Sequence, residues 1–287
     1  MKEAYKSTIE RAKIICEALP YIRKYSGKTL VIKYGGNAMN DEAVTTTILQ
    51  DIAALKIVGV NPILVHGGGP EINKMLTKLG IEPKFADGMR VTDKATMEIA
   101  QMILCGKINK NIVGELNLMG VKAIGLCGKD SQLIKAETLD DKLGYVGKIT
   151  EINAKLLEIL AEDEFIPVIA SIATDDKGDS YNVNADVAAA AIGAAVHAEK
   201  LMFLTDIDGI MLNKDNAQSL IKHIDAAGLQ SMIDDGSISG GMVPKAKSCI
   251  DAIERGINSV MVINGTLPHS ILLELFTDSG VGTMIEK

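Results

Sequence analysis

The chain has 287 residues, of which 47% are hydrophobic, and a formal net charge of −7. That length accommodates one large domain or two smaller ones, and the apolar content is ample for a sizeable core. The acidic balance argues against nucleic acid or an anionic membrane as the main partner.

The cysteines and the first residues indicate a cytoplasmic protein. The four cysteines are scattered without metal-ligand spacing, which favours reduced thiols and no protein metal site. Charged residues interrupt the first turns, so we expect no signal peptide. No apolar run reaches the roughly 18–20 residues that a membrane-spanning helix needs.

Residues 5–24 are predicted to form an amphipathic helix, because apolar residues recur at helical spacing at Ile9, Ala12, Ile15, Cys16 and Leu19. The helix precedes the first strand and is not needed to build a sheet. It can pack on another subunit or on its own domain, and the pattern alone favours its own domain.

Strand and helix then alternate along the chain, which predicts a parallel sheet with right-handed crossovers. Two lobes are expected to share one continuous sheet, with the join near residues 190–200. The expected strands are 29–34, 62–65, 121–126, a pair within 132–150, 165–171, 200–204 and 259–263. The expected helices are about 41–59, 70–79, 93–119 with a possible break at Gly106, 152–161, 184–198, 243–255 and 271–276.

Three glycine-rich corners stand where a strand gives way to a helix. They read VIKYGGN (31–37), VHGGGP (65–70) and SGGMVPK (239–245). Such corners expose backbone N–H groups at helix N-termini, which attract anions. Lys33 and Lys245 lie beside two of them, which predicts a nucleotide-phosphate site. Neither a P-loop nor a dinucleotide-binding fingerprint occurs in the chain.

Each corner also has a plainer interpretation. Lys33 alone is as well explained by a lysine that snorkels from a strand end, and only the adjacent Gly35 and Gly36 favour phosphate. The three glycines after His66 exceed what a tight turn needs, which favours close approach of a ligand to the backbone. For His66 itself we predict packing and no catalytic role.

Polar residues elsewhere complete the predicted site. Arg90 can bind a carboxylate through two parallel hydrogen bonds, although a surface salt bridge is commoner for a lone arginine. Asn184 is explained as a helix N-cap, which leaves Asn182 free for a ligand. Asp186 can lie between Lys33 and Lys245. A lysine in the first helical turn, as at position 245, is electrostatically unfavourable unless an anion lies nearby.

The joint pattern resembles the amino acid kinase family and, within it, the acetylglutamate kinases of the arginine-inhibited subgroup. The motifs that carry the resemblance are VIKYGGNAM (31–39), VHGGGP (65–70), FADGMRVTD (85–93), YNVNAD (181–186), LTDIDGI (204–210), GGMVPK (240–245) and ELFTDSGVGTMI (274–285). The resemblance implies a three-layer αβα sandwich around an open, mainly parallel sheet. It also implies ATP-dependent phosphorylation of the side-chain carboxylate of N-acetyl-L-glutamate, the second step of arginine biosynthesis.

The resemblance implies the following roles. Lys33 and Lys245 stabilise the transferring phosphoryl group, and Asp186 orients them. Acetylglutamate is held by Gly68, Gly69, Arg90 and Asn182, with Arg90 on its α-carboxylate. ATP, which carries Mg²⁺, is held by Gly35, Gly36, Asp206, Gly209, Gly240 and Gly241.

The subgroup further implies regulation and assembly. Residues 1–26 form an oligomerisation helix, 27–194 the acetylglutamate-binding lobe and 195–287 the ATP-binding lobe. Helices of neighbouring subunits interlace to link dimers into a hexamer. L-arginine is expected as an inhibitor that contacts Lys200, His269, Glu274 and Gly282.

Two alternatives remain open. One is a kinase of the same family for aspartate, glutamate, an aminoadipate-type acceptor or uridylate; the combination of Arg90 and Asn182 favours a small acylated amino acid over a nucleotide. The other is a binding protein that has the fold without turnover, which the intact set of Lys33, Lys245 and Asp186 disfavours.

Overall fold

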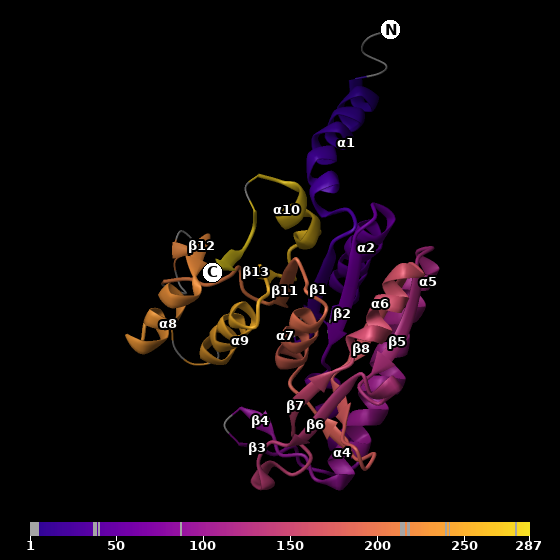
Figure 1. The fold of residues 1–287 in the computed structure, drawn as a ribbon, viewed down its shortest axis with the longest axis vertical. Coiled ribbons are helices and arrows are strands. Elements are labelled where there is room, and N and C mark those ends of the chain that lie inside the picture. The colour runs from indigo at the N-terminus through magenta and orange to yellow at the C-terminus, as the bar shows by residue number, and fades with distance from the viewer. Residues whose placement is uncertain are drawn as a thin grey trace.

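An eight-stranded, mainly parallel sheet forms the centre of the molecule, with helices on both faces (Figure 1). The computed structural model describes residues 6–36, 39, 41–86, 88–212, 216, 219–238, 240, 242–278 and 280–287. The strand order is β12-β14-β13-β11-β1-β2-β8-β5, in which β12 and β14 run parallel to each other and antiparallel to the other six strands. The strands are β1 (Thr29–Tyr34), β2 (Asn61–His66), β5 (Lys122–Cys127), β8 (Phe165–Ala170), β11 (Lys200–Thr205), β12 (His223–Asp225), β13 (Ser259–Asn264) and β14 (Thr283–Glu286).

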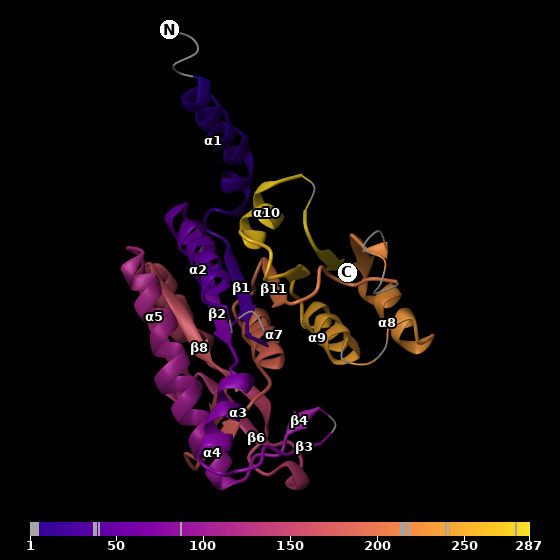
Figure 2. The ribbon, with the colours of Figure 1, turned by 180° about the vertical axis from the view of Figure 1, so that it is seen from behind.

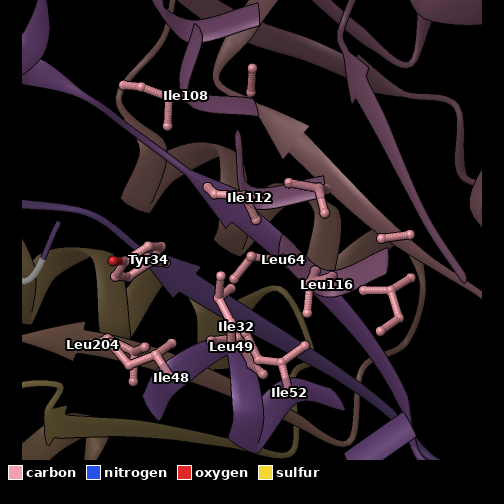
Figure 3. Close-up of a cluster of buried hydrophobic side chains, with 14 of the residues drawn as sticks. Ile32, Tyr34, Ile48, Leu49, Ile52, Leu64, Ile108, Ile112, Leu116 and Leu204 are labelled. Carbon is pink, nitrogen blue, oxygen red and sulfur yellow. The ribbon is translucent and has the colours of Figure 1, made fainter. Parts of the chain in front are cut away.

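Side chains along each strand point alternately to the two faces of the sheet, so the sheet separates two hydrophobic cores. In β1, Leu30, Ile32 and Tyr34 face one layer, whereas Val31 faces the other. The first layer contains α2 (Glu42–Ile57), α5 (Asn109–Leu118) and α10 (Ser270–Phe276). Figure 3 shows part of this core, in which Ile32 and Leu64 of the sheet lie among Ile48 and Ile52 of α2. The second layer contains α6 (Ala154–Glu162), α7 (Ala185–Ala195), α8 (Ala226–Asp234) and α9 (Met242–Glu254).

The predicted alternation of strands and helices is confirmed. The sheet continues without a gap from β1 to β11, so strands before and after residues 190–200 share it. The α2 helix begins after its N-cap Asp41, whose side chain accepts hydrogen bonds from the amides of Ala43 and Val44. The division into lobes at 194/195 stays a prediction.

The long helix expected over 93–119 does not break at Gly106. It consists of α4 (Lys94–Gln101), a π-helical segment η2 (Met102–Ile108) and α5. A π-helical turn inserts one residue per turn without ending the helix, and Gly106 lies inside it. The segment joins α4 to α5, and α3 (Gly69–Lys78) packs against α4 and the segment; α3 and α4 lie side by side in Figure 2.

A second sheet has the order β10-β9-β6-β7, from β6 (Ile134–Thr138), β7 (Gly147–Ile152), β9 (Ile172–Thr174) and β10 (Ser180–Asn182). The strands β6 and β7 correspond to the pair predicted within 132–150, whereas β9 and β10 were not predicted. A two-stranded hairpin joins β3 (Phe85–Ala86) to β4 (Met89–Arg90). Residues 175–179 connect β9 to β10. The strand β12, the helix α8 and the strand β14 were not predicted either.

The first helix, α1 (Lys6–Tyr25), projects from the rest of the chain (Figures 1 and 2). Its apolar side chains Ile9, Ile15 and Leu19 are 51%, 64% and 53% exposed. The prediction that this helix packs along its own domain is therefore wrong; only its last turns approach α10. No helix in the described ranges has both the length and the apolarity to cross a membrane.

Candidate active site

Lys33, Asp186 and Lys245 meet at one point, although they lie far apart in the sequence. Asp186 Oδ1 is 2.8 Å from Lys33 Nζ, and Asp186 Oδ2 is 3.3 Å from Lys245 Nζ. All three side chains are largely buried. Burial would raise the pKa of Asp186, but the charges of Lys33 and Lys245 outweigh it and hold that pKa below its usual value. The carboxylate is therefore ionised and holds both ammonium groups together.

The strand pattern explains how Lys33 reaches this point. Lys33 shares its face of β1 with Val31, which packs in the core beneath α7 and α9. Phe203 of β11 is the partner of Lys33 in the neighbouring strand, and Lys245 Nζ lies 5.5 Å from the centre of the Phe203 ring. Phe203 is thus a neighbour of both lysines, of Lys33 across the strands and of Lys245 through its ring.

Helix ends place the other two members. Asn184 caps α7, as predicted, and its Oδ1 accepts a hydrogen bond of 2.8 Å from the Asp186 amide. Lys245 lies in the first turn of α9, where the helix dipole disfavours a cation. The carboxylate of Asp186 supplies the anion that this position requires.

A cavity of about 550 Å³ opens beside the ionic triad of Lys33, Asp186 and Lys245. Lys33 and Asp186 line the cavity. Lys245 does not line it but is connected to it by its ion pair with Asp186. The glycines of two predicted corners and both predicted polar ligands also form its walls: Gly35, Gly36, Gly67, Gly68, Gly69, Arg90 and Asn182. The structure therefore brings the predicted catalytic and acetylglutamate residues to one cavity.

Arg90 is a buried cation that has no counter-ion among the described residues. It is 8% exposed, its guanidinium lies 4.8 Å from the centre of the Phe85 ring, and Nη2 donates to the Gly69 carbonyl at 3.3 Å. Nη1 is buried with no partner among the described residues. Burial lowers the pKa of Arg90, but a guanidinium remains charged in a protein. Arg90 therefore does not form the surface salt bridge that is common for a lone arginine. Its charge is available to an anion in the cavity.

Packing and hydrogen bonding in the structure account for two other predicted acetylglutamate residues, Gly68 and Asn182. A Cβ at Gly68 would lie 2.2 Å from Ile108 Cδ1, so only glycine fits against the π-helical segment. Asn182 was predicted to be free for a ligand. It lines the cavity, and its Nδ2 also donates to Thr92 Oγ1 at 3.3 Å.

Comparison with known proteins supports the resemblance to the amino acid kinase family that the sequence motifs indicated. The sequence model of the amino acid kinase family matches residues 28–264. The chain belongs to the amino acid kinase family. Two relatives named acetylglutamate kinase, from Caldicellulosiruptor bescii and Methanocaldococcus jannaschii, are 53% and 49% identical; the alignments cover 99% and 97% of both chains.

Two solved structures are also similar to this chain. The N-acetylglutamate synthase of Neisseria gonorrhoeae, complexed with coenzyme A and N-acetyl-glutamate, is 26% identical with a TM-score of 0.85. The match covers 96% of this chain but 63% of the synthase. The protein smu.665 of Streptococcus mutans is 30% identical with a TM-score of 0.76, over 90% and 98% of the two chains.

The residues predicted for ATP are only partly gathered at the triad. Gly35 and Gly36 line the cavity, whereas Asp206 and Gly209 lie beyond the end of β11. A Cβ at Gly209 would lie 2.6 Å from Thr283 Oγ1, so packing alone explains this glycine. Gly240 precedes α9 with φ +59° and open space around it, and Gly241 lies outside the described residues. Their role in ATP binding stays a prediction.

A second cavity, of about 260 Å³, lies between the last turns of α1 and the segment α10–β14. Three of the residues predicted for arginine line it, namely Lys200, Glu274 and Gly282. The fourth, His269, does not line it; His269 Nδ1 is 2.7 Å from Asp51 Oδ1 of α2. Residues of α1 complete the wall, among them Tyr21, Lys24 and Tyr25.

Charged groups line this second cavity. Lys200 is buried, its Nζ donates to Ser259 Oγ at 2.9 Å, and burial lowers its pKa. Glu274 Oε2 accepts the amides of Val281 and Gly282 at 2.7 and 3.2 Å. The cavity therefore offers groups of both signs.

Some residues of the main cavity were missed from the sequence. Phe85 stacks on Arg90, and Ser171 and Lys148 line the walls. Phe85 and Arg90 are direct partners across the β3–β4 hairpin, a pairing that two-residue strands do not reveal. Among the described residues, no group of three or more His, Cys, Asp or Glu side chains is arranged to hold a metal ion. All four cysteines have free thiols.

Proposed function

We propose that the chain phosphorylates the side-chain carboxylate of N-acetyl-L-glutamate with MgATP, giving N-acetyl-L-glutamyl 5-phosphate in arginine biosynthesis. The observation that carries the proposal is a cavity beside two lysines that share one aspartate, with a buried arginine in its wall that pairs with no carboxylate of the described ranges. Relatives of about 50% identity over nearly the whole chain bear the name of this kinase.

The chemistry requires charge neutralisation rather than a base. A carboxylate acceptor is already ionised at neutral pH, so no group has to remove a proton from it. The difficulty is to bring two anions together in line. Lys33 and Lys245 can neutralise charge on the transferring phosphoryl oxygens, and the amides after Lys33 can bind phosphate. Mg²⁺ enters as part of the nucleotide substrate.

The residues that line the cavity indicate how the acceptor is oriented in it. Its α-carboxylate fits Arg90, whose buried Nη1 needs an anionic partner. Its side-chain carboxylate then lies toward Lys33, where the γ-phosphoryl group arrives. Phe85 and Val146 give the cavity apolar surface, which suits an uncharged acetyl group better than a free ammonium.

The proposal is tested by trapping the acyl phosphate. The pure protein is incubated with MgATP and one acceptor at a time, and hydroxylamine converts any acyl phosphate to a coloured hydroxamate. Signal with N-acetyl-L-glutamate, and at least about 100-fold less kcat/KM with glutamate, aspartate or aminoadipate, is expected because a free ammonium is costly in this cavity. Higher kcat/KM with one of those acceptors would replace the proposal with a related kinase.

We further propose that L-arginine inhibits the enzyme at the second cavity. A guanidinium and an α-carboxylate need groups of both signs, which Glu274 and Lys200 supply. The exposed apolar face of α1 suits the interlaced helices of a hexamer. His269 can take part only after leaving Asp51, so its assignment is the weakest of the four. Location in the cytoplasm stays a prediction.

A further inference from the structure

His66 at the end of β2 is fully buried and makes two directed hydrogen bonds. Its Nδ1 is 2.9 Å from the Gly67 carbonyl oxygen. Because a carbonyl only accepts, Nδ1 carries the proton and Nε2 does not. Nε2 accordingly accepts from Asn109 Nδ2 at 3.1 Å. These contacts select one neutral tautomer of the imidazole.

Asn109 is itself held firmly. It is 1% exposed, and its Nδ2 also donates to the Val168 carbonyl of β8 at 2.8 Å. Its Oδ1 accepts from Lys110 Nζ at 3.1 Å. A Cβ at Gly125 would lie 1.9 Å from Asn109 Oδ1, so the β5 backbone presses closely on this amide. The side chain therefore presents its N–H to His66 from a fixed position.

The π-helical segment places Asn109 and also braces the glycine corner. Asn109 directly follows η2, whose last residue, Ile108, packs against the Cα of Gly68 together with Leu104. Without the π-helical register, Ile108 and Asn109 would point elsewhere around the helix. The end of η2 and the residue that follows it thus contact both Gly68 and the imidazole that binds Gly67.

The glycine corner needs such support. Residues 67–69 are all glycine, so no side chain restricts the rotation of the peptide groups between them. The Gly67 carbonyl points to His66, so the N–H of Gly68 in the same planar peptide points the opposite way. No described residue accepts a hydrogen bond from this amide, and Gly67 and Gly68 line the main cavity.

We propose that His66 and Asn109 are positioning residues that fix the Gly67–Gly68 peptide so that the Gly68 amide is presented to an anionic oxygen of the acceptor. The proposal rests on the acceptor kinase function above. Neither side chain touches substrate. Asn109 selects the tautomer, His66 holds the Gly67 carbonyl, and the peptide plane transmits the orientation to the Gly68 N–H.

Two variants of His66 separate this role from packing. His66→Asn keeps a donor near the position of Nδ1, whereas His66→Gln reaches only the position of Nε2. We expect His66→Gln to lower kcat/KM for N-acetyl-L-glutamate about 10-fold or more, and His66→Asn to stay within about 3-fold of wild type. KM for ATP should change less than about 2-fold in both. Equal losses in the two variants would overturn the proposal.

Asn117 provides a matched control for Asn109. It lies on the same helix, and its side chain also bonds strand backbone, accepting from the Ala123 amide at 2.8 Å. Both Asn109→Ala and Asn117→Ala should lower the thermal midpoint. Only Asn109→Ala should lower kcat/KM for the acceptor, by about 5-fold, because the imidazole loses the donor that selects its tautomer. Equal kinetic effects would contradict the proposal.

The tautomer can be measured without turnover. Nitrogen-15 NMR of the histidine-labelled protein should show His66 protonated at Nδ1 in wild type and a mixture of tautomers in Asn109→Ala. An Nε2-protonated imidazole in wild type would overturn the positioning role. If wild type does not phosphorylate N-acetyl-L-glutamate, the kinase proposal fails, and this measurement still decides the arrangement of His66.

Discussion

At the scale of single residues, Lys33, Asp186 and Lys245 form an ionic unit in which neither lysine has a purely structural reason to be present. Lys245 opposes the dipole of its own helix, and Lys33 occupies a position among apolar neighbours such as Val31 and Phe203. Such local conflicts are typical of functional sites. The carboxylate of Asp186 reconciles them in the absence of substrate.

Loss of either lysine should lower turnover more than stability. Lys33→Ala or Lys245→Ala is expected to lower kcat roughly 10²-fold or more, because a charge contact to the transferring phosphoryl group is lost. Steady-state assays by hydroxamate formation measure this. Lys155→Ala is the control, since Lys155 is exposed and pairs with Glu158. Near-wild-type kcat in both triad variants would contradict the assignment.

His66 gives a second prediction at this scale. Burial and the charge of Lys110 lower its pKa from 6.5 to about 4, although the Gly67 carbonyl favours the protonated form. Between these pH values the unfolded chain binds a proton that the native state does not, so stability falls as pH falls from about 6.5 to 4. The contribution lost between pH 7 and pH 5 is about 2 kcal/mol.

Urea unfolding at the two pH values measures this contribution. Wild type should lose about 2 kcal/mol more between pH 7 and pH 5 than His66→Asn, which has no titrating group at this position. The comparison removes the effect of other titrating residues. An equal loss in both proteins would show that the buried imidazole takes up its proton near the usual pH.

The sequence predicted the triad, with Asp186 between the two lysines, but not the hydrogen bonds of His66. Glycine-rich corners and two lysines were sufficient to predict a phosphate site, because the carboxyl ends of parallel strands lie at one edge of a sheet. His66 was expected only to pack. Its hydrogen bonds depend on Asn109, which lies 43 residues away and shows no pattern that marks it. Long-range side-chain pairs of this kind require coordinates.

At the scale of elements, α1 near the beginning of the chain and α10 near its end meet at the second cavity. Tyr21 and Lys24 of α1 lie in the wall of the second cavity with Glu274 of α10. Tyr21 also donates a hydrogen bond to Asp278, which follows α10. A ligand in this cavity therefore contacts two elements whose relative position it can stabilise.

Arginine inhibition should depend on the last turns of α1. Lys24→Ala is expected to raise the arginine concentration for half-inhibition about 5-fold or more, because it removes one wall of the cavity. Lys13→Ala, on an earlier turn of the same helix, should leave inhibition unchanged. Deletion of residues 1–24 should abolish inhibition and preserve activity. Persistent inhibition in the deleted protein would contradict the regulatory proposal.

The elements that were predicted well are those with strong periodicity. The buried strands β1, β2, β8, β11 and β13 are apolar runs between turn residues, and their ends fall within two residues of prediction. Strands such as β9, β10 and β12 are three residues long, too short for a pattern. The π-helical segment η2 was missed because hydrophobic spacing does not distinguish it from α-helix.

At the scale of the whole molecule, one continuous sheet carries both predicted lobes. The two lysines come from opposite sides of the β1–β11 junction, since Lys33 lies in β1 and Lys245 in a helix that packs on β13. Any change in the angle between the lobes would alter the position of Lys245 relative to the cavity. Substrate-driven closure of this kind is common in phosphoryl-transfer enzymes.

Assembly should depend on the projecting helix. Ile15 is 64% exposed, as expected for a side chain that packs on another subunit. Ile15→Asp is expected to lower the mass in solution to roughly one third, from hexamer to dimer, because a charge would be buried at the contact. Light scattering measures this, with Lys13→Asp as the surface control. An unchanged mass would contradict assembly through α1.

The most direct test of the account follows the oxygen atoms. N-acetyl-L-glutamate labelled with oxygen-18 in its side-chain carboxylate is incubated with the protein and MgATP, and phosphorus-31 NMR observes the product. We expect an acyl phosphate resonance shifted by the heavy bridging oxygen, because the acceptor carboxylate attacks the γ-phosphorus. An acyl phosphate without the shift, or no acyl phosphate, would contradict the proposed kinase reaction.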